Sequence, residues 1–233
     1  MNSTDPTQSF ILDSIPFVPD LPALQTRLRI REGSRHVAEL ARLAAEAETV
    51  ARPKALYKLA FIEAKAEDAV VIEGVRFTSR VLRVNLDVAH RVFAYIITCG
   101  RELDDWAQAF DDIVHRFWAD AIKEMALRTA IQALTQHLND CYSLGRTAMM
   151  SPGSLADWPI QEQRPLFALL GDTRAAIGVA LTDSFLMIPD KSVSGIRFPT
   201  EESFESCQLC PRETCPGRRA PYDSTLFERK YAS

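Results

Sequence analysis

The sequence predicts an α+β fold, and three patterns support this prediction. Apolar and β-branched residues form short runs over residues 56–86 and again over residues 92–98. Apolar residues recur at helical spacing over residues 110–141, a stretch without proline or glycine. Residues 192–198 alternate between apolar and polar or small residues, as a strand does. A mixture of strand and long-helix patterns of this kind is typical of the α+β class.

The first hundred residues predict an arm, a helix and several strands. Residues 1–20 are rich in proline, serine and aspartate, and we expect an N-terminal extension that packs loosely without an element of its own. Apolar residues at helical spacing from Pro22 predict one amphipathic helix that ends before Pro53. Two or three strands should follow over residues 56–86, with Gly74 as a turn, and residues 92–98 predict a strand that leads into a loop.

The remainder predicts the long helix, a loop, a short helix, a strand and a polar tail. Gly145 is placed to end the helix over residues 110–141. A turn-rich loop over residues 151–159 precedes a predicted helix at residues 161–170. We therefore expect an N-terminal extension (1–20), one main domain (21–200) and a cysteine-bearing C-terminal tail (201–233).

Composition indicates an ordinary globular protein. The 233 residues are 47% hydrophobic and 25% charged, which argues against a disordered chain. The net charge of −4 provides no general attraction to nucleic acid or to an anionic membrane, so neither is an expected partner. No apolar run has the length of a membrane span, and residues 1–13 lack the pattern of a secretory signal, so a cytoplasmic location is expected.

Three of the five cysteines predict a metal site. Cys207, Cys210 and Cys215 form a Cys-x2-Cys-x4-Cys cluster, and soft thiolates at this spacing suit zinc or an iron–sulfur cluster. Proline follows Cys210 and Cys215, as in cluster-binding loops, which favours iron–sulfur over zinc. Cys99 is the first candidate for a fourth ligand and Cys141 the second. Unligated surface thiols are the remaining alternative.

Other common sites find no support in the sequence. The four histidines are scattered and lack ligand spacing with one another or with cysteine. Neither a phosphate-binding Gly-x4-Gly-Lys-Ser/Thr motif, a Gly-x-Gly-x2-Gly motif nor a Gly-x-Ser-x-Gly elbow occurs. The sequence therefore predicts no nucleotide-triphosphate hydrolysis, no Rossmann dinucleotide site and no elbow-type serine hydrolase.

The second half of the chain carries a dense set of motifs in a fixed order. These are Ser151-Pro152-Gly153, Asp157-Trp158-Pro159, Gln163, Phe167, Ile177-Gly178-Val179, Leu181-Thr182-Asp183-Ser184-Phe185, Met187, Pro189 and Ser192-Val193-Ser194-Gly195. The set resembles the activation domain of cobalamin-dependent methionine synthase, and most of all the free-standing activation-domain-like proteins. Upstream, Thr98-x-Gly100 followed by Glu102-Leu103 is similar to a Thr-x-Gly segment of the free-standing proteins. The resemblance covers about residues 54–199.

The resemblance implies a fold, a ligand and a set of binding residues. The family folds as a twisted antiparallel sheet with long helices, and it binds S-adenosylmethionine. Carried over by position, the cofactor-binding residues would be Arg146, Ser151, Pro152, Gly153, Thr98 and Gly100. The chain departs from the family where Ser154 replaces a tyrosine after the glycine and where Gln136 replaces a helical glutamate.

The resemblance and the cysteines together predict an accessory protein of corrinoid methyl transfer. On this hypothesis, the chain reactivates a corrinoid-binding methyltransferase, such as methionine synthase, by reduction with an iron–sulfur cluster of the 4Fe-4S type. S-adenosylmethionine would supply the methyl group, and an electron donor would reduce the cluster. The corrinoid would lie on the partner, because the chain lacks an Asp-x-His-x2-Gly corrinoid loop. The alternative is a non-catalytic binding module, stapled by zinc, that docks on a methyltransferase.

Overall fold

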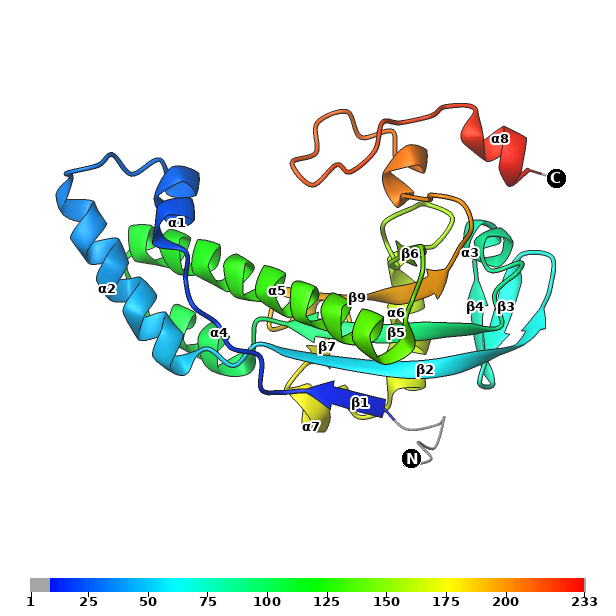
Figure 1. Ribbon diagram of the computed structural model, residues 1–233, viewed down its shortest axis with the longest axis horizontal. Coiled ribbons are helices and arrows are strands. Elements are labelled where there is room, and N and C mark those ends of the chain that lie inside the picture. Colours follow the sequence, from blue (N-terminus) through cyan, green and yellow to red (C-terminus); the bar gives the residue numbers. More distant parts are fainter. Residues whose placement is uncertain (1–8, 233) are drawn as a thin grey trace.

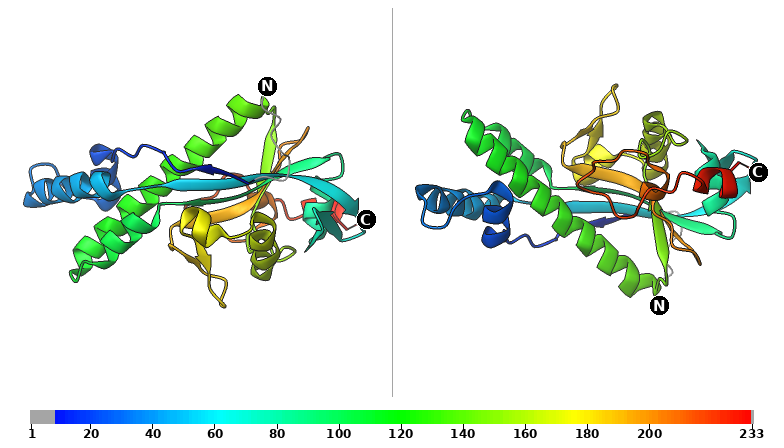
Figure 2. Two further views of the ribbon diagram at one scale, coloured as in Figure 1. Left: turned by 90° about the horizontal axis from the view of Figure 1, so that it is seen from below. Right: turned by 90° about the horizontal axis from the view of Figure 1, so that it is seen from above.

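The computed structural model describes residues 9–232, which form a sheet covered by helices on both faces (Figures 1 and 2). Seven strands build the main sheet, and every pairing in it is antiparallel. They are β1 (Ser9–Leu12), β2 (Lys54–Lys65), β3 (Ala69–Ile72), β4 (Val75–Thr78), β5 (Arg91–Thr98), β6 (Thr147–Met150) and β9 (Ser192–Pro199). A separate short hairpin joins β7 (Ala180–Leu181) and β8 (Met187–Ile188).

The strand order β4-β3-β2-β5-β9-β6 puts the two long strands β2 and β5 side by side in the middle. On its other edge, β2 pairs with β1 through residues 55–58 and with β3 through residues 62–65. Strand β9 lies between β5 and β6, with Thr98 opposite Ser192 and Met150 opposite Ile196. The loop that follows β6 and the loop that precedes β9 are therefore attached to neighbouring strands.

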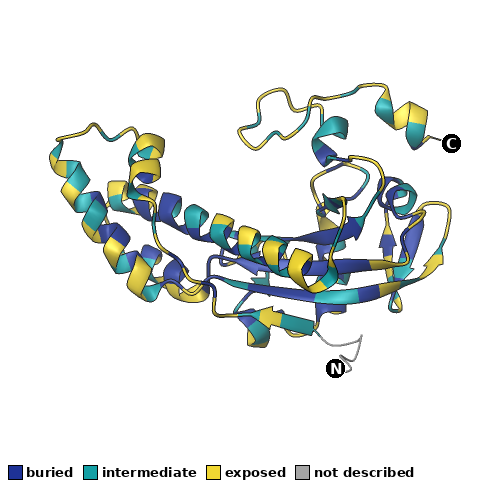
Figure 3. Ribbon diagram, in the orientation of Figure 1, coloured by how far each residue is buried: buried dark blue, intermediate teal, exposed yellow. Residues whose placement is uncertain are grey.

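Side-chain alternation along the strands divides the interior into two cores. In β5, Val92, Ala94 and Ile96 belong to one buried cluster, whereas Phe93 and Tyr95 belong to the other. Both faces of the sheet are covered, because successive strand residues point to opposite faces and both sets are apolar. Figure 3 shows this burial along the central strands.

Helix α5 (Ile113–Tyr142) covers one face of the sheet, and α1 (Leu21–Leu28), α2 (Arg35–Val50) and α4 (Arg101–Gln108) pack against α5. Helix α5 crosses this face diagonally (Figure 2). Asp20 and Asp112 cap α1 and α5 by accepting hydrogen bonds from the first free backbone N–H groups. Among residues 9–232, no helix is both long and apolar enough to cross a membrane.

Shorter helices cover the opposite face: α3 (Arg80–Asn85), α6 (Gln163–Leu170) with the 3-10 turn η1 (Ile160–Glu162) before it, and α7 (Thr173–Ile177). Leu166, Leu170 and Ile177 pack there against the strand residues Ala94 and Ile96. Asp157 connects the loop after β6 to α3 by accepting hydrogen bonds from the backbone N–H groups of Arg80 and Val81.

The C-terminal tail is anchored at both of its ends. It contains the 3-10 turn η2 (Ser206–Leu209) and helix α8 (Leu226–Lys230). Phe204 and Tyr231 are buried in the same core, and their ring centroids lie 6.4 Å apart. The Tyr231 hydroxyl donates to Asn85 Oδ1 at 3.0 Å, which fastens the end of the tail to α3. The residues between these anchors are mostly exposed or half-buried (Figure 3).

The structure confirms the predicted α+β class, the strand at 92–98, the long helix and the strand at 192–198. The single helix predicted before Pro53 is wrong, because Arg29 adopts a left-handed conformation and ends α1 before α2 begins. The N-terminal arm forms an element after all: β1 pairs with β2, and Phe10 stacks on Tyr57. Residues 80–85 form a helix where a strand was expected, capped by the Ser79 hydroxyl. Residues 1–8 of the arm lie outside the described residues.

Candidate functional site

A cavity of about 890 Å³ lies between helix α5, strands β5 and β9, the loop after β6 and the C-terminal tail. We call the surface made by α5, β5 and β9 the floor of the cavity. We call residues 205–220 the tail loop, and this loop forms the facing wall. The floor is polar only at a few positions, which are Tyr95, Thr135, Arg197 and the charged residues along its edge.

Arg197 is the central polar group of the floor. Its side chain comes from β9, the residue is only 7% exposed, and it lines the cavity. One guanidinium nitrogen, Nη2, donates to Thr135 Oγ1 at 2.9 Å and to Met149 Sδ at 3.2 Å. Burial lowers the pKa of Arg197, although an arginine of this kind stays charged at neutral pH. The floor therefore holds a buried positive charge.

Glycine at position 195 shapes the floor beside Arg197. A Cβ atom there would lie 2.5 Å from the Met150 carbonyl oxygen, 2.7 Å from the Tyr95 hydroxyl and 2.9 Å from Ser151 Oγ. Only glycine lets two hydroxyl groups approach the strand this closely. Burial raises the pKa of Tyr95, so its hydroxyl is a proton-bearing donor at the cavity.

The loop after β6 forms the rim of the cavity. Ser151, Gly153 and Ser154 line it, and Pro152 is buried beneath. Gly153 has a φ of +82°, and a Cβ atom there would lie 2.7 Å from the Ile160 side chain. The Gly153 N–H donates to the Trp158 carbonyl at 2.7 Å, which closes the turn. Glycine is thus required at this position for both conformational and steric reasons.

One arginine organises the tail loop. The Arg218 guanidinium donates to the carbonyl oxygens of Cys207, Cys210 and Ala220 at 3.0–3.1 Å, and also to that of Arg212. A planar guanidinium has five N–H donors, so one side chain can hold several turns of a loop that has little regular structure.

Cys207, Cys210 and Cys215 all line the cavity from the tail loop. The backbone N–H of Arg219 donates to Cys207 Sγ at 3.4 Å. Among residues 9–232, however, no three histidine, cysteine, aspartate or glutamate side chains are grouped closely enough to hold a metal ion. The structure thus brings the three predicted ligands to one cavity without gathering them around a point.

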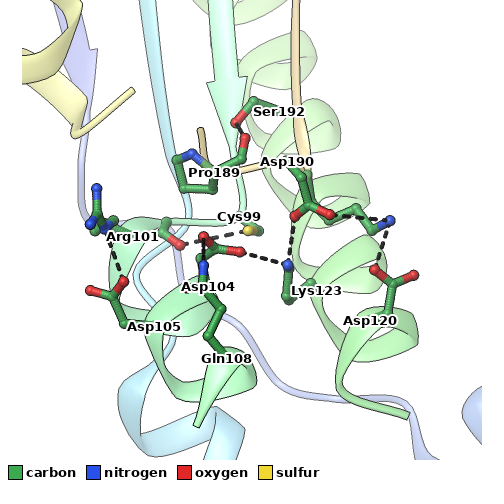
Figure 4. Close-up of polar contacts among 12 residues, drawn as sticks. Cys99, Arg101, Asp104, Asp105, Gln108, Asp120, Lys123, Pro189, Asp190 and Ser192 are labelled. Atoms are coloured by element: carbon green, nitrogen blue, oxygen red, sulfur yellow. Dashed lines mark hydrogen bonds and ion pairs between the residues drawn. The ribbon is translucent and has the colours of Figure 1, made fainter. Parts of the chain in front are cut away.

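Cys99 lies elsewhere, in the core beneath α4 and α5 (Figure 4). It is fully buried, and burial raises the pKa of its thiol to about 12. Its thiol donates to the Gly100 carbonyl, and it is not a cavity residue. The placement of Cys99 therefore does not support the prediction that it completes a site with the tail cysteines. Cys141, the second candidate, is exposed on α5 and also lies outside the cavity lining.

An ion-pair network centred on the buried Lys123 fixes the loop that precedes β9 (Figure 4). Lys123 Nζ on α5 lies 2.6 Å from Asp104 Oδ1 on α4 and 2.5 Å from Asp190 Oδ1 on the loop. Burial alone would lower the pKa of Lys123, but the two carboxylates outweigh it and the pKa is raised. The next residue, Lys191, lines the cavity and pairs with Asp120 at 2.8 Å.

Thr98 and Gly100 belong to this buried region and do not line the cavity. Thr98 Oγ1 accepts hydrogen bonds from the Gly100 N–H and from Ser192 Oγ, at 3.2 and 2.9 Å. A Cβ atom on Gly100 would lie 2.2 Å from the Arg52 carbonyl oxygen, so the glycine is needed for packing. Their placement indicates that Thr98 and Gly100 support the structure rather than contact a ligand in this cavity.

Arg146 is also separated from the predicted site. It lines a second hollow of about 450 Å³ with His90 and Pro199, and its guanidinium donates to the Glu201 carbonyl at 2.8 Å. Of the six predicted cofactor-binding residues, the structure therefore brings only Ser151 and Gly153 to the lining of the large cavity, with Pro152 buried in the same turn.

Sequence reasoning missed Arg197 and Tyr95. The strand pattern over residues 192–198 contains a signal for Arg197, because it is the only charged residue in an otherwise apolar or small-residue strand. Tyr95 is hidden within an apolar run, and its importance follows only from Gly195, which lies opposite it in the β5–β9 pairing.

Comparison with known proteins identifies the architecture. Residues 104–207 match the family model of the vitamin B12 dependent methionine synthase activation domain. This part of the chain is therefore similar to that activation domain. The matched range contains α5, β9 and the loop that follows β6. It ends at Cys207, so Cys210 and Cys215 lie beyond it.

The fold resembles that of a solved activation-type domain. The crystal structure of the MetH reactivation domain bound to AdoHcy superposes with a TM-score of 0.61 at 18% sequence identity, covering 85% of this chain and 81% of that one. A comparison with curated proteins finds no match.

Proposed function

We propose that this protein reactivates a corrinoid-binding methyltransferase, such as vitamin B12 dependent methionine synthase. The observation that carries the proposal is that the Ser151–Gly153 turn and the three tail cysteines face one cavity in an activation-domain-like fold. A loop for a small ligand and a set of soft metal ligands would then serve the same reaction from opposite sides.

S-adenosylmethionine is the methyl donor in this proposal. The structurally similar MetH domain binds AdoHcy, which is the product left when S-adenosylmethionine loses its methyl group. The turn at Gly153 leaves backbone groups accessible at the rim, and Tyr95, Ser151 and Arg197 supply hydrogen-bond donors beside it. These groups suit the carboxylate of an amino acid.

The tail cysteines would hold an iron–sulfur cluster. Three soft donors lie on one wall, and the Arg219 N–H already donates to Cys207 Sγ, a contact of the kind that tunes cluster thiolates. Because Cys99 is buried elsewhere, an exogenous ligand would fill the fourth position unless the chain rearranges. When bound, the cluster would supply single electrons.

The proposed reaction transfers one electron and one methyl group to the cobalt of the partner. One electron from a reduced electron-carrier protein would pass through this protein and reduce the partner's cobalt from Co(II) to Co(I). The reduced cobalt would then take the methyl group, so that the sulfonium–methyl bond breaks, a cobalt–carbon bond forms and neutral AdoHcy leaves. The chain's own residues would bind and orient the donor.

Anaerobic purification tests the redox half of the proposal. We expect near-stoichiometric iron and sulfide with a broad visible absorption band, and loss of both in Cys210→Ser. Cys141→Ser is the matched control, because Cys141 is a free thiol outside the cavity. Zinc, or no metal, in the wild type would contradict electron transfer by this chain.

Association with a corrinoid protein tests the other half. We expect the chain to bind a reduced corrinoid-binding methyltransferase and to restore its activity after oxidation. No association under reducing conditions, with or without S-adenosylmethionine, would overturn the proposal.

One observation favours the alternative of a zinc-stapled, non-catalytic module that docks on a methyltransferase. Gln136, which replaces the family's ligand-binding glutamate, donates to Asp140 at 2.7 Å on an exposed face of α5 and does not line the cavity. Zinc without iron, together with partner binding but no binding of S-adenosylmethionine in calorimetry, would support this alternative.

A further inference from the structure

The second hollow, of about 450 Å³, lies at one end of the main sheet, and we call it the small cavity. Its lining comes from three segments: residues 88–91 where β5 begins, residues 145–146 before β6, and residues 199–201 where β9 ends. Among residues 9–232, the small and the large cavity share no lining residue. A ligand in the small cavity would therefore not compete with S-adenosylmethionine in the large one.

Strand pairing brings two arginines to this end of the sheet. The β5–β9 register, extended by two residues, places Arg91 level with Pro199. On the other side of β9, Pro199 pairs with Thr147, the residue after Arg146. Neighbouring strands are about 4.8 Å apart, so the backbones at Arg91 and Thr147 are separated by about 10 Å. Two arginine side chains can reach one small ligand across this distance.

Positive charge predominates in the small cavity. The basic residues of its lining are His90, Arg91 and Arg146, and Glu201 is the one acid in the part of the lining that the structure describes. None of these four side chains forms a salt bridge with another described residue. Arg146 Nη1 donates to the Glu201 carbonyl oxygen at 2.8 Å, which positions the guanidinium and leaves its other N–H groups for a ligand.

Nearby charged residues do not neutralise the small cavity. Asp87 and Glu202 flank the lining in sequence, but each pairs with a basic residue outside it, at 2.8 and 2.6 Å. Lys65 adds a further cation, because its ammonium group donates to the carbonyl oxygens of Asp87 and Ala89 at 2.6 and 2.9 Å. These bonds also fix the turn that forms one wall. The small cavity therefore favours an anionic ligand.

The pair of guanidinium groups favours phosphate over carboxylate. A guanidinium binds either anion through two parallel N–H donors. A carboxylate has two oxygen atoms, whereas the phosphate of a monoester has three terminal ones, enough to accept from Arg91 and Arg146 together. Val88 and Pro199 add apolar lining for an organic group, and the volume suits a small molecule. We propose that the small cavity binds a phosphomonoester, with its phosphate between the two arginines and its organic group against Val88 and Pro199.

Titration calorimetry on the anaerobically purified chain tests the inference with phenyl phosphate, inorganic phosphate and benzoate at one ionic strength. We expect phenyl phosphate to bind most tightly, because it combines the phosphate with an apolar group. Arg91→Gln should weaken that binding about tenfold, because it removes charge-assisted hydrogen bonds. The Arg91 side chain is exposed and contacts no polar partner in the described chain, so this variant should fold. Arg146→Gln should weaken binding by a similar factor.

Two controls separate the small cavity from other basic surfaces. Arg174→Gln controls for net charge, because Arg174 is exposed on α7 and lines neither cavity. Arg212→Gln controls for location, because Arg212 is an exposed residue of the large cavity. Both variants should keep the affinity of the wild type for phenyl phosphate.

Three results would overturn the inference. They are no saturable binding of phenyl phosphate to the wild type, binding of benzoate as tight as that of phenyl phosphate, and an affinity that is unchanged in both Arg91→Gln and Arg146→Gln. The inference goes beyond the proposed function, since it concerns neither S-adenosylmethionine nor the corrinoid partner. Association with that partner is measured separately, so either idea can fail while the other stands.

Discussion

The floor and the tail loop face each other across one cavity, but they are built in opposite ways. The floor consists of a long helix and two central strands, and its polar groups project from regular structure with a core behind them. The tail loop has little regular structure, and the carbonyls of four of its residues converge on Arg218. Figure 1 shows the tail above β6 and β9.

The floor can hold side chains in fixed positions, whereas the tail loop can adapt its conformation. Groups fixed by a packed sheet keep their geometry when a ligand leaves, whereas a loop held by hydrogen bonds to one side chain can rearrange at low cost. Arg197 therefore suits recognition, and the three cysteines suit a group that is inserted after folding. Changes in the floor should affect the whole protein, and changes in the tail loop should stay local.

The largest effect should follow from Lys123→Met. This substitution leaves the carboxylate of Asp104, which is 3% exposed, without its cation, and we expect unfolding free energy to fall by about 3–5 kcal/mol. Lys191→Met is the comparison, because Lys191 pairs with the half-exposed Asp120 and should cost about 1 kcal/mol or less. Urea denaturation measures both. Equal losses would refute the view that the buried network anchors the floor.

Glycine substitutions compare the two sides of the cavity directly. Gly195→Ala places a Cβ atom 2.5 Å from a backbone oxygen in the floor and should cost about 2 kcal/mol or more. Gly217→Ala lies in the tail loop, where an added Cβ meets nothing within 4 Å, and should change stability by about 0.5 kcal/mol or less. Thermal unfolding provides the measurement. A tolerated alanine at 195 would show that the floor is more adaptable than its packing indicates.

Arg218→Gln should loosen the tail loop without unfolding the protein. We expect faster amide hydrogen exchange in residues 207–220, while global stability falls by about 1 kcal/mol. Arg229→Gln is the matched control. The exposed Arg229 guanidinium lies on α8 and pairs with Asp223 in the segment before that helix. Exchange that accelerates equally in the floor would contradict the separation of the two sides.

The smallest effect concerns acid stability at the edge of the floor. Hydrogen bonding to Arg27, assisted by Arg128 and opposed by partial burial, lowers the pKa of Glu124 to about 2. A lowered carboxyl pKa stabilises the fold above its ordinary value of 4.5, and this contribution disappears as the pH falls through about 2.

We therefore expect Glu124→Gln to be less stable than the wild type by about 1 kcal/mol at pH 7 and equally stable near pH 2. Denaturant midpoints measured across this pH range provide the test. Glu46→Gln, which removes a carboxylate from an exposed pair with Arg42 on α2, should show a smaller difference. A gap that stays constant with pH would indicate that packing, and not charge, is responsible.

The sequence predicts the fold well where periodicity extends over many residues. The helix at 113–142 and the strands at 91–98 and 192–199 are long enough for one period to dominate. The apolar run in residues 80–85 is too short to distinguish a strand from a helix, and the Ser79 cap was the usable signal. Strand β1 depends on a tertiary contact, the stacking of Phe10 on Tyr57, which no local pattern contains.

The site is less predictable than the fold for a related reason. Family resemblance found the Ser151–Gly153 turn, because its motif is contiguous. Arg197 and Tyr95 meet only through the register of β5 and β9, in which Gly195 lies opposite Tyr95 and Arg197 opposite Phe93. Arg146 is close to the turn in sequence, but β6 carries it to the other end of the strand, where it lines a different hollow.

The contact between Phe204 and Tyr231 gives the cysteine segment a property that a free tail would lack. Because both ends of the segment are fixed in the core, the thiols are confined near the cavity and have a high effective concentration there. A group captured by one cysteine would meet the other two without a diffusional search. The ligation steps after that first capture would then be intramolecular, with rates independent of protein concentration.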